Sequence, residues 1–257
     1  MPFKAEKVSY GFPHQEYPRQ AVSNMLTNLK NTIGLTYEPV AITFLYDEDE
    51  FDDYPAEVRD AHIPYCVMVK RAAVSNVSRK TLLRHHACDG GTTALGLEPS
   101  TPEIDSGKTY FSYNLYSSVA TAHRHLLSIK RLCDEPFSVH GVAVVPLGKC
   151  ERTPDVVIMV VNSYQAMRLV QGYAYHTGRK PEIDLGAMQA MCSEVTASPY
   201  ITGEMNVSVM CPSTRMLCKW GESEMLVGIP YELIETVASG VEATGRQIGR
   251  ASCRERV

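Results

Sequence analysis

The sequence lacks any long apolar run. No stretch of its 257 residues approaches the roughly 20 apolar residues that a membrane-spanning helix needs. Its first residues mix both charges and are not followed by an apolar segment, unlike a secretory signal. The formal net charge is −4 and no basic stripe is present, which argues against nucleic acid as a partner. We therefore expect a cytoplasmic protein that binds neither membranes nor nucleic acids.

The sequence also lacks a proline- and serine-rich linker and an internal repeat. Residues 141–147 and 155–161 are nearly continuous apolar runs, which are typical of strands buried on both faces and predict a central position in a sheet. Apolar residues recur every three or four positions over 20–33 and 115–129, which predicts amphipathic helices. We expect a mixed α/β or α+β fold, with one globular domain over residues 1–247 and a central mixed sheet flanked by helices.

The last ten residues, 248–257, match the translation of a common sequencing adapter in one reading frame. Such a tail carries no information about the fold, so it is left out of the fold prediction. We expect the natural protein to continue differently beyond Gln247.

Cysteine is well represented, with eight residues, but no Cys-x-x-Cys pair occurs. Spacing alone therefore does not predict a metal site. Cys88 follows a predicted strand, residues 81–87, and Gly90 and Gly91 let the chain turn sharply into a helix. Backbone N–H groups at such a turn favour an anion or a thiolate, and the helix dipole is expected to lower the pKa of the thiol. The alternative is a tight turn in which Cys88 packs as a small apolar residue.

Three polar side chains are candidate contacts for a small ligand. Arg215 follows Cys211 by four residues and could hold an anion with a fork of hydrogen bonds. Gln165 and Arg168 lie early in a helix that directly follows a buried strand, and ligands gather at the carboxyl ends of strands in open parallel sheets. A surface ion pair, or an exposed helical turn, is the alternative for each.

A set of segments follows in order along most of the chain: 38–42, 88–91 with 94–97, 154–157, 165–169, 203–206 with Cys211 and Arg215, and 228–231. Together they resemble the domain of unknown function 169 family. The resemblance implies no settled activity, and it implies a reducing cytoplasm because members are common in anaerobic archaea and bacteria. Members often carry glycine before the cysteine at position 211, where this chain has Met210.

The resemblance also implies a set of cysteines. Cys66 and Cys192 fall where family members carry cysteine, in addition to Cys88 and Cys211. Four thiolates brought together by folding could hold an iron–sulfur cluster or another soft metal. His86 is the better of two neighbouring histidines as an additional ligand, because residues alternate between the faces of a strand. Buried, inert thiols are the alternative, and this is the expected role of the cysteines outside the matching segments, Cys133, Cys150 and Cys218.

Three functions follow from these patterns. The leading hypothesis is a metal- or iron–sulfur-binding protein with its site at Cys88 and Cys211. The second is a thiol enzyme in which Cys88 is the nucleophile. The third is a non-catalytic module that binds a small anionic ligand through Gly90, Gly91, Arg168 and Arg215.

Overall fold

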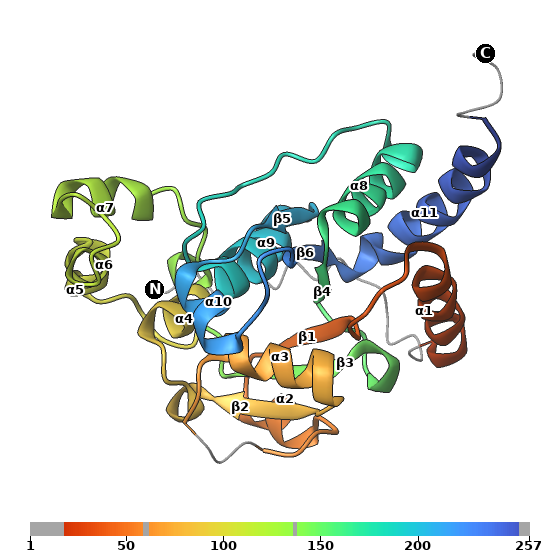
Figure 1. The fold of residues 1–257 in the computed structure, drawn as a ribbon. Helices are drawn as coiled ribbons and strands as arrows, with labels where there is room; N and C mark the ends of the chain where they lie inside the picture. Colours follow the sequence, from red (N-terminus) through yellow and green to blue (C-terminus); the bar gives the residue numbers. More distant parts are fainter. Residues whose placement is uncertain (1–17, 59–61, 136–137, 252–257) are drawn as a thin grey trace.

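A six-stranded antiparallel sheet lies at the centre of the computed structural model (Figure 1), in the order β2-β3-β1-β4-β6-β5. The structure describes residues 18–58, 62–135 and 138–251, with side chains up to residue 245. The predicted mixed class, a central sheet flanked by helices, is confirmed, but the strands pair antiparallel rather than in a mixed sheet. The strands are β1 (Val40–Leu45), β2 (Arg79–Leu82), β3 (Gly141–Pro146), β4 (Val156–Val161), β5 (Asn206–Ser208) and β6 (Met225–Pro230).

The two apolar runs near residues 141 and 155 form β3 and β4, whose residues are all buried. Both strands are interior in the sheet, as predicted, with β1 between them. Successive side chains of a strand point to opposite faces, so the sheet separates two cores. In β1, Ile42 and Phe44 face one core while Ala41 faces the other.

One face of the sheet, here called the long-helix face, is covered by α1 (Arg19–Ile33), α8 (Ser163–Thr177) and α11 (Tyr231–Ala251). These helices lie together on one side of the molecule in Figure 1. The start of α8 is fixed by a capping box, in which Asn162 and Gln165 each bond the backbone N–H of the other at 2.9 Å. The apolar stripes of the three helices bury one continuous core against the sheet.

The opposite face, here called the cysteine face, is covered by shorter helices. Proline precedes or opens two of them, which suits the first helical turn because its N–H has no partner within the helix. The segments are α3 (Tyr65–Ser75), α4 (Asp89–Ala94), a π-helix (Ala190–Ala197), α9 (Ser198–Thr202) and α10 (Pro212–Cys218).

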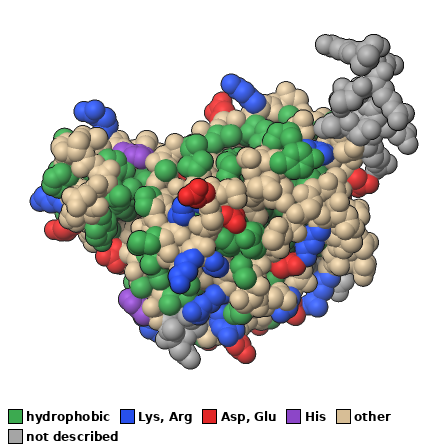
Figure 2. All heavy atoms as spheres, in the orientation of Figure 1, with side chains coloured by type: hydrophobic (Ala, Val, Ile, Leu, Met, Phe, Trp, Pro, Cys, Tyr) green, Lys and Arg blue, Asp and Glu red, His purple; other side chains and the backbone are tan. Residues whose placement is uncertain are grey.

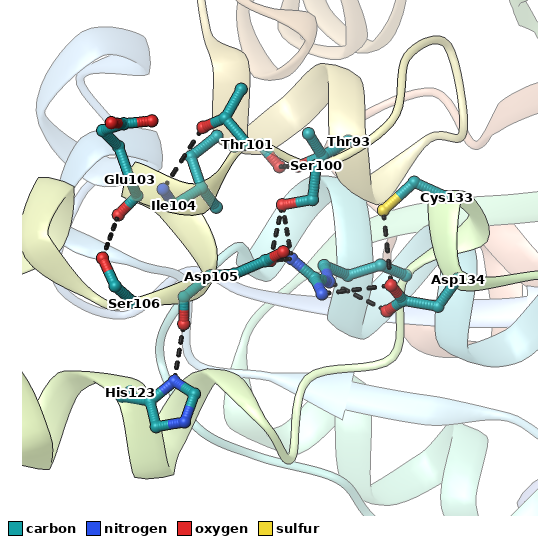
Figure 3. A network of polar contacts seen from close by, with 12 residues as sticks. Thr93, Ser100, Thr101, Glu103, Ile104, Asp105, Ser106, His123, Cys133 and Asp134 are labelled. Atoms are coloured by element: carbon teal, nitrogen blue, oxygen red, sulfur yellow. Dashed lines mark hydrogen bonds and ion pairs between the residues drawn. The ribbon is translucent and has the colours of Figure 1, made fainter.

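A small lobe projects beside the cysteine face and is built from α5 (Pro102–Asp105), α6 (Lys108–Ser112) and α7 (Val119–Leu126). It has its own small core and exposes hydrophobic side chains, visible in Figure 2. The lobe is tied to the rest of the chain by the guanidinium of Arg131. It donates to Asp105, Asp134 and Ser100 at 2.9 to 3.1 Å. Figure 3 shows these three residues side by side.

Two predicted elements differ from the structure. The helix predicted over 115–129 is only α7, because Ser118 caps its start and the helix ends at Leu126, so Leu115 and Ile129 of the apolar repeat lie outside it. The strand predicted over 81–87 ends at Leu82, where the His85 ring accepts a hydrogen bond from the Leu82 N–H at 3.0 Å and a 3₁₀ turn begins.

The remaining helices are short, and none of the described helices is long and apolar enough to cross a bilayer. At the C-terminus, α11 extends to Ala251, and residues 252–257 of the predicted tail lie outside the described residues. The other short helices are α2 (Glu48–Asp53) and the 3₁₀ turns Leu83–His85, Leu132–Asp134 and Leu147–Lys149.

Candidate functional site

The four cysteines named from the sequence come together on the cysteine face. Burial raises the pKa of the Cys192 thiol, and Cys88, Cys211 and Cys66 raise it further by charge interaction. Burial likewise raises the pKa of Cys88, with Cys66 and Cys211 contributing. Electrostatic influence of this kind requires the sulfur atoms to lie close to one another. Folding therefore gathers thiols that are far apart in the sequence.

Each of these four thiols sits at or near the start of a helix. Cys88 and Cys211 are the N-cap residues of α4 and α10. Cys66 is the second residue of α3, and Cys192 is the third residue of the π-helix. Helix starts leave backbone N–H groups without partners inside the helix and carry partial positive charge. Four separate elements thus direct their positive ends toward one group of sulfur atoms.

Backbone N–H groups meet the sulfurs directly. The Thr214 N–H donates to Cys211 Sγ at 3.4 Å, and Cys211 Sγ lies 3.2 Å from the Thr214 hydroxyl. In the same way, the Gly91 N–H bonds the Cys88 thiol and the Val67 N–H bonds the Cys66 thiol. Each of these hydrogen bonds opposes the rise in the pKa of its thiol but does not outweigh it.

A fifth thiol, Cys218, completes what is here called the thiol cluster (Cys66, Cys88, Cys192, Cys211 and Cys218). A hydrogen bond with Cys218 raises the pKa of Cys66, and the same bond lowers the pKa of Cys218. Lys70 also lowers the pKa of Cys218; its ammonium donates to the Cys218 carbonyl and lies 4.4 Å from the centre of the Trp220 ring. The sequence analysis assigned Cys218 a structural role and did not place it beside Cys66.

Cys218 could have been recognised from its spacing. It follows Cys211 by seven residues, and two helical turns bring side chains seven apart to the same face. Lys70 follows Cys66 by four residues, which places both on one face of α3.

Polar groups from the lobe and the π-helix surround Cys192. Cys192 Sγ donates to the carbonyls of Gln189, at 3.5 Å, and Gly90, at 3.9 Å. The Gln189 amide donates to the Tyr110 hydroxyl at 2.6 Å. A Cβ on Gly90 would collide with that hydroxyl, so the glycine is required for close approach. The lobe thus contributes Tyr110 to the edge of the thiol cluster.

The predicted lowering of the Cys88 pKa by the helix dipole is wrong. Burial of the sulfur among protein atoms raises the pKa of Cys88, although the residue as a whole is exposed and the Gly91 N–H opposes the rise. The helix that Cys88 caps has only six residues, so its dipole is small. Without a bound cation, this thiol is protonated near neutral pH.

The histidines near Cys88 have structural partners. Burial lowers the pKa of His86 to about 4, and its Nε2 lies 3.0 Å from the Thr81 hydroxyl. His85 accepts the Leu82 N–H, as described above. Neither ring is hydrogen-bonded to Cys88 in the described part of the chain.

The candidate ligand contacts Gln165, Arg168 and Arg215 do not meet at one place. Gln165 donates to the carbonyls at residues 33 and 34, and Arg168 donates to Val241 O and the Thr244 hydroxyl, both on the long-helix face. Arg215 donates to Val209 O at 2.8 Å and to Glu224 O at 3.1 Å, which holds the turn between α10 and β6. Ligands gather at the carboxyl ends of strands in open parallel sheets, whereas β4, which precedes Gln165 and Arg168, pairs antiparallel with both of its neighbours.

Gly90 and Gly91 lie in the first turn of α4 beside Cys88, as expected. Cys150 is separate from the thiol cluster, in the core of the long-helix face, and donates to Arg152 O at 2.9 Å. Burial raises the pKa of Cys133 to about 11, and its Sγ lies 3.7 Å from the Asp134 carboxylate. Within the described residues, no group of three or more His, Cys, Asp or Glu side chains is placed to hold a metal ion.

Comparison with known proteins identifies the family. The model of the domain of unknown function 169 family, described as uncharacterised ArCR, matches residues 28–240. The chain belongs to this family. An uncharacterised protein of Methanocaldococcus jannaschii is 24% identical over 187 residues, which cover 72% of this chain and 79% of the relative. No solved structure matches the chain.

Membership of the domain of unknown function 169 family gives Met210 a physical meaning. Its backbone has a φ of 71°, in the left-handed region that favours glycine. A glycine, which the family resemblance implies at this position, would adopt that conformation without strain. Met210 adopts it at some conformational cost, and the turn delivers Cys211 to the start of α10.

Proposed function

We propose that this protein binds an iron–sulfur cluster, or another thiolate-bound metal, through Cys66, Cys88, Cys192 and Cys211 in the cytoplasm. The observation that carries the proposal is the meeting of these four thiols from four helical elements on one face of the sheet. A reducing cytoplasm keeps such cysteines free for a metal.

The chemistry of the donor set suits a soft metal. Thiolates are the ligands that iron–sulfur clusters and other soft metals prefer. Backbone N–H groups of Val67, Gly91 and Thr214 act on three of the sulfurs, and such bonds stabilise thiolates and tune cluster potentials. Neighbouring thiols raise the pKa of Cys88 and Cys192 further because thiolates repel. A bound cation offsets that repulsion and deprotonates the thiols that coordinate it.

A cluster and a single ion differ in the spacing of the sulfurs that they need. In a tetrahedral zinc site with Zn–S bonds of about 2.3 Å, the sulfurs lie about 3.8 Å apart. No such set of three ligands occurs among the residues that the structure describes. The thiolates of a cluster bind different irons, so they are spaced more widely. When bound, a cluster would transfer single electrons or polarise a substrate.

In this proposal, the residues around the iron–sulfur cluster have different roles. Cys66, Cys192 and Cys211 are buried and would hold the inner side, whereas the exposed Cys88 would hold the side that faces solvent. Tyr110 and Gln189 would shield the cluster on the side of the lobe.

The test is the iron and acid-labile sulfide content of protein purified without oxygen, together with its visible absorption. We expect both elements in the wild type and a large loss in Cys88→Ser and in Cys211→Ser. Cys150→Ser and Cys133→Ser are matched controls, because these cysteines lie outside the thiol cluster, and both should retain the wild-type content. Wild-type protein without iron or another bound metal would overturn the proposal.

One observation favours a second candidate function, a thiol enzyme that uses Cys88. Cys88 is exposed whereas the other four thiols of the cluster are buried. A nucleophilic Cys88 would be alkylated far faster than the remaining thiols in metal-free protein. Its raised pKa and the structural partners of His85 and His86 weigh against this function.

A further inference from the structure

An exposed apolar surface lies directly outside the thiol cluster. Helices α3 and α10 pack against each other and carry the buried Cys66 and Cys211 at or near their starts (Figure 1). Met216 on α10 is 72% exposed, and Leu217 beside it and Val209 just before the helix are also exposed. Apolar side chains that gather at the surface with polar residues around them mark interaction sites. This surface is therefore a candidate for a docking site.

The charged residues around this surface are all basic. The α3 helix and residues 209–221 contain no aspartate or glutamate, although the chain as a whole has a net charge of −4. Their basic residues are Lys70, Arg71, Arg215 and Lys219. None of the four forms an ion pair within the described part of the chain. Positive charge without a paired carboxylate attracts an acidic partner. The surface is here called the α10 patch (Val209, Met216, Leu217, Lys70, Arg71, Arg215 and Lys219).

Two of the basic side chains are held in place by the fold. The Lys70 ammonium donates to the Cys218 carbonyl and lies 4.4 Å from the centre of the Trp220 ring. The Arg215 guanidinium donates to the carbonyl of Glu224 at 3.1 Å. Carbonyl oxygens do not neutralise these positive charges. Because both side chains are already ordered, a partner that binds them loses less entropy than it would with mobile side chains.

The α10 patch is close to the proposed metal site. The α10 helix has seven residues, which span about 10 Å. Cys211, a proposed ligand, caps its start, and Met216 lies in its second turn. A protein docked on the α10 patch would therefore bring its own redox group near the cluster without entering the fold.

The composition of the α10 patch suits a protein partner. Protein interfaces have an apolar centre and a polar rim, and methionine and arginine are enriched in them. Segments that bind a membrane surface typically anchor through aromatic residues as well, and no residue of the α10 patch is aromatic. We propose that the α10 patch docks a protein with an acidic surface that carries single electrons to the cluster. This inference rests on the proposed function. In the transfer, the reduced carrier loses one electron and the cluster gains it, and no bond or proton is exchanged.

The experiment uses a flavodoxin, a small acidic electron carrier, as the probe. Protein purified without oxygen should oxidise reduced flavodoxin by one electron, which the absorbance of the flavin reports. The rate should fall at least about tenfold when salt is raised from about 0.01 M to about 0.15 M, because the Debye length shortens to about 8 Å. Oxidised flavodoxin should slow hydrogen exchange in α3 and α10, and this second readout does not depend on a bound cluster.

Two variants of the α10 patch are compared with two matched variants of the lobe. Arg71→Glu and Met216→Glu should each slow the electron transfer about fivefold at low salt and weaken the protection of α3 and α10. Arg124→Glu reverses an exposed charge on α7, and Leu127→Glu changes a side chain that is 74% exposed, so both should behave as the wild type. All four variants keep every cysteine, and their iron content should equal that of the wild type.

The outcomes separate this inference from the proposed function. Protein that holds no iron would overturn both, since nothing would accept the electron. Iron-loaded protein in which the patch variants and the lobe variants react equally fast would overturn the docking site alone. Protection of α3 and α10 by vesicles of anionic lipid, but not by flavodoxin, would assign the α10 patch to a membrane and would also overturn the inference.

Discussion

The two faces of the sheet are covered by helices of different lengths. The long-helix face has three helices of 15, 15 and 21 residues, so it offers much lateral apolar surface and few helix ends. On this face Gly240 lets α11 pack directly against the backbone of α8 at Gly172, where a Cβ would collide. The cysteine face has helices of 5 to 11 residues and therefore many helix starts.

Because of this difference, we expect the long-helix face to contribute most to stability and the cysteine face to carry the chemistry. Burial of apolar side chains scales with the lateral surface of a helix, whereas unpartnered N–H groups occur only at its ends. A face made of short helices gives up apolar contact but can aim several N–H groups at one place. In this protein that place is occupied by thiols, and the backbone there includes left-handed residues such as Gln189 and Met210. The predictions below test this division.

The largest expected effect on stability is on the long-helix face. Leu169 on α8 is fully buried, so Leu169→Ala should lower the free energy of unfolding by about 2–5 kcal/mol through lost transfer energy and a cavity. Met167→Ala is the control, since Met167 lies on the same helix and is 41% exposed. Denaturant unfolding measures both. Loss of bound iron from folded Leu169→Ala protein would contradict the division of stability and chemistry between the two faces.

On the cysteine face, a smaller effect is expected from Gly90→Ala. The new methyl group meets the Tyr110 hydroxyl and breaks its 2.6 Å bond with Gln189, so the free energy of unfolding should fall by about 1–3 kcal/mol. Gly148→Ala is matched to it, because the nearest atom to a Cβ there is 3.8 Å away. Equal unfolding curves for the two variants would show that Tyr110 does not pack against the thiol cluster as described.

The long-helix face was largely predictable from the sequence, and the reason is local. The spacing of Val22, Leu26, Leu29 and Ile33 records which side of α1 is buried. The apolar runs of β3 and β4 likewise predict interior strands. The directions in which strands pair depend on the path of the chain through the whole fold. No local pattern states that direction, and the predicted mixed sheet is therefore antiparallel in the structure.

The candidate site was predictable only in part. The family resemblance gave Cys66, Cys88, Cys192 and Cys211, but only the fold shows that they meet. The π-helix that carries Cys192 begins at Gln189 in a left-handed conformation, for which side-chain periodicity gives no signal. The hydrogen-bond partners of Arg168 and Gln165 could not be foreseen, because they lie on α11 and at the end of α1, far away in sequence. The role of Cys218 was overlooked although its spacing from Cys211 was available.

A more local effect is expected for the lobe, in Arg131→Met. Arg131 is 11% exposed and bonds two carboxylates that are about half exposed, so the loss should be about 1–2 kcal/mol after allowance for solvent screening. Hydrogen exchange of the amides of α5 and α7 should increase, while that of the sheet stays unchanged. Arg19→Met removes an exposed ion pair with Glu151 on the other face and should have little effect.

The same ion pair gives a pH dependence. Burial raises the pKa of Asp105, but hydrogen bonds from Ser100 and Arg131 outweigh it, so that the pKa is lowered overall. A lowered carboxyl pKa adds stability above the unfolded value of about 3.9, and this stability is lost as the pH falls through the folded value. The lobe of the wild type should therefore open in acid. In Arg131→Met, this part of the acid sensitivity should be smaller, because only the hydrogen bond from Ser100 then lowers the pKa of Asp105.

The smallest expected effect, and the sharpest test of the thiol cluster, is the comparison of Cys218→Ser with Cys66→Ser. The two thiols are hydrogen-bonded to each other, and a serine hydroxyl at either position can keep a hydrogen bond. Each variant should therefore change the free energy of unfolding by no more than about 1 kcal/mol. Only Cys66→Ser should lose iron and sulfide, because Cys66 belongs to the proposed ligand set and Cys218 does not. If Cys218→Ser lost iron while Cys66→Ser kept it, the ligand would be Cys218, at the end of α10, and not Cys66. The cluster would then be held by two thiols of that one helix, and the convergence of four helix starts would no longer describe the site.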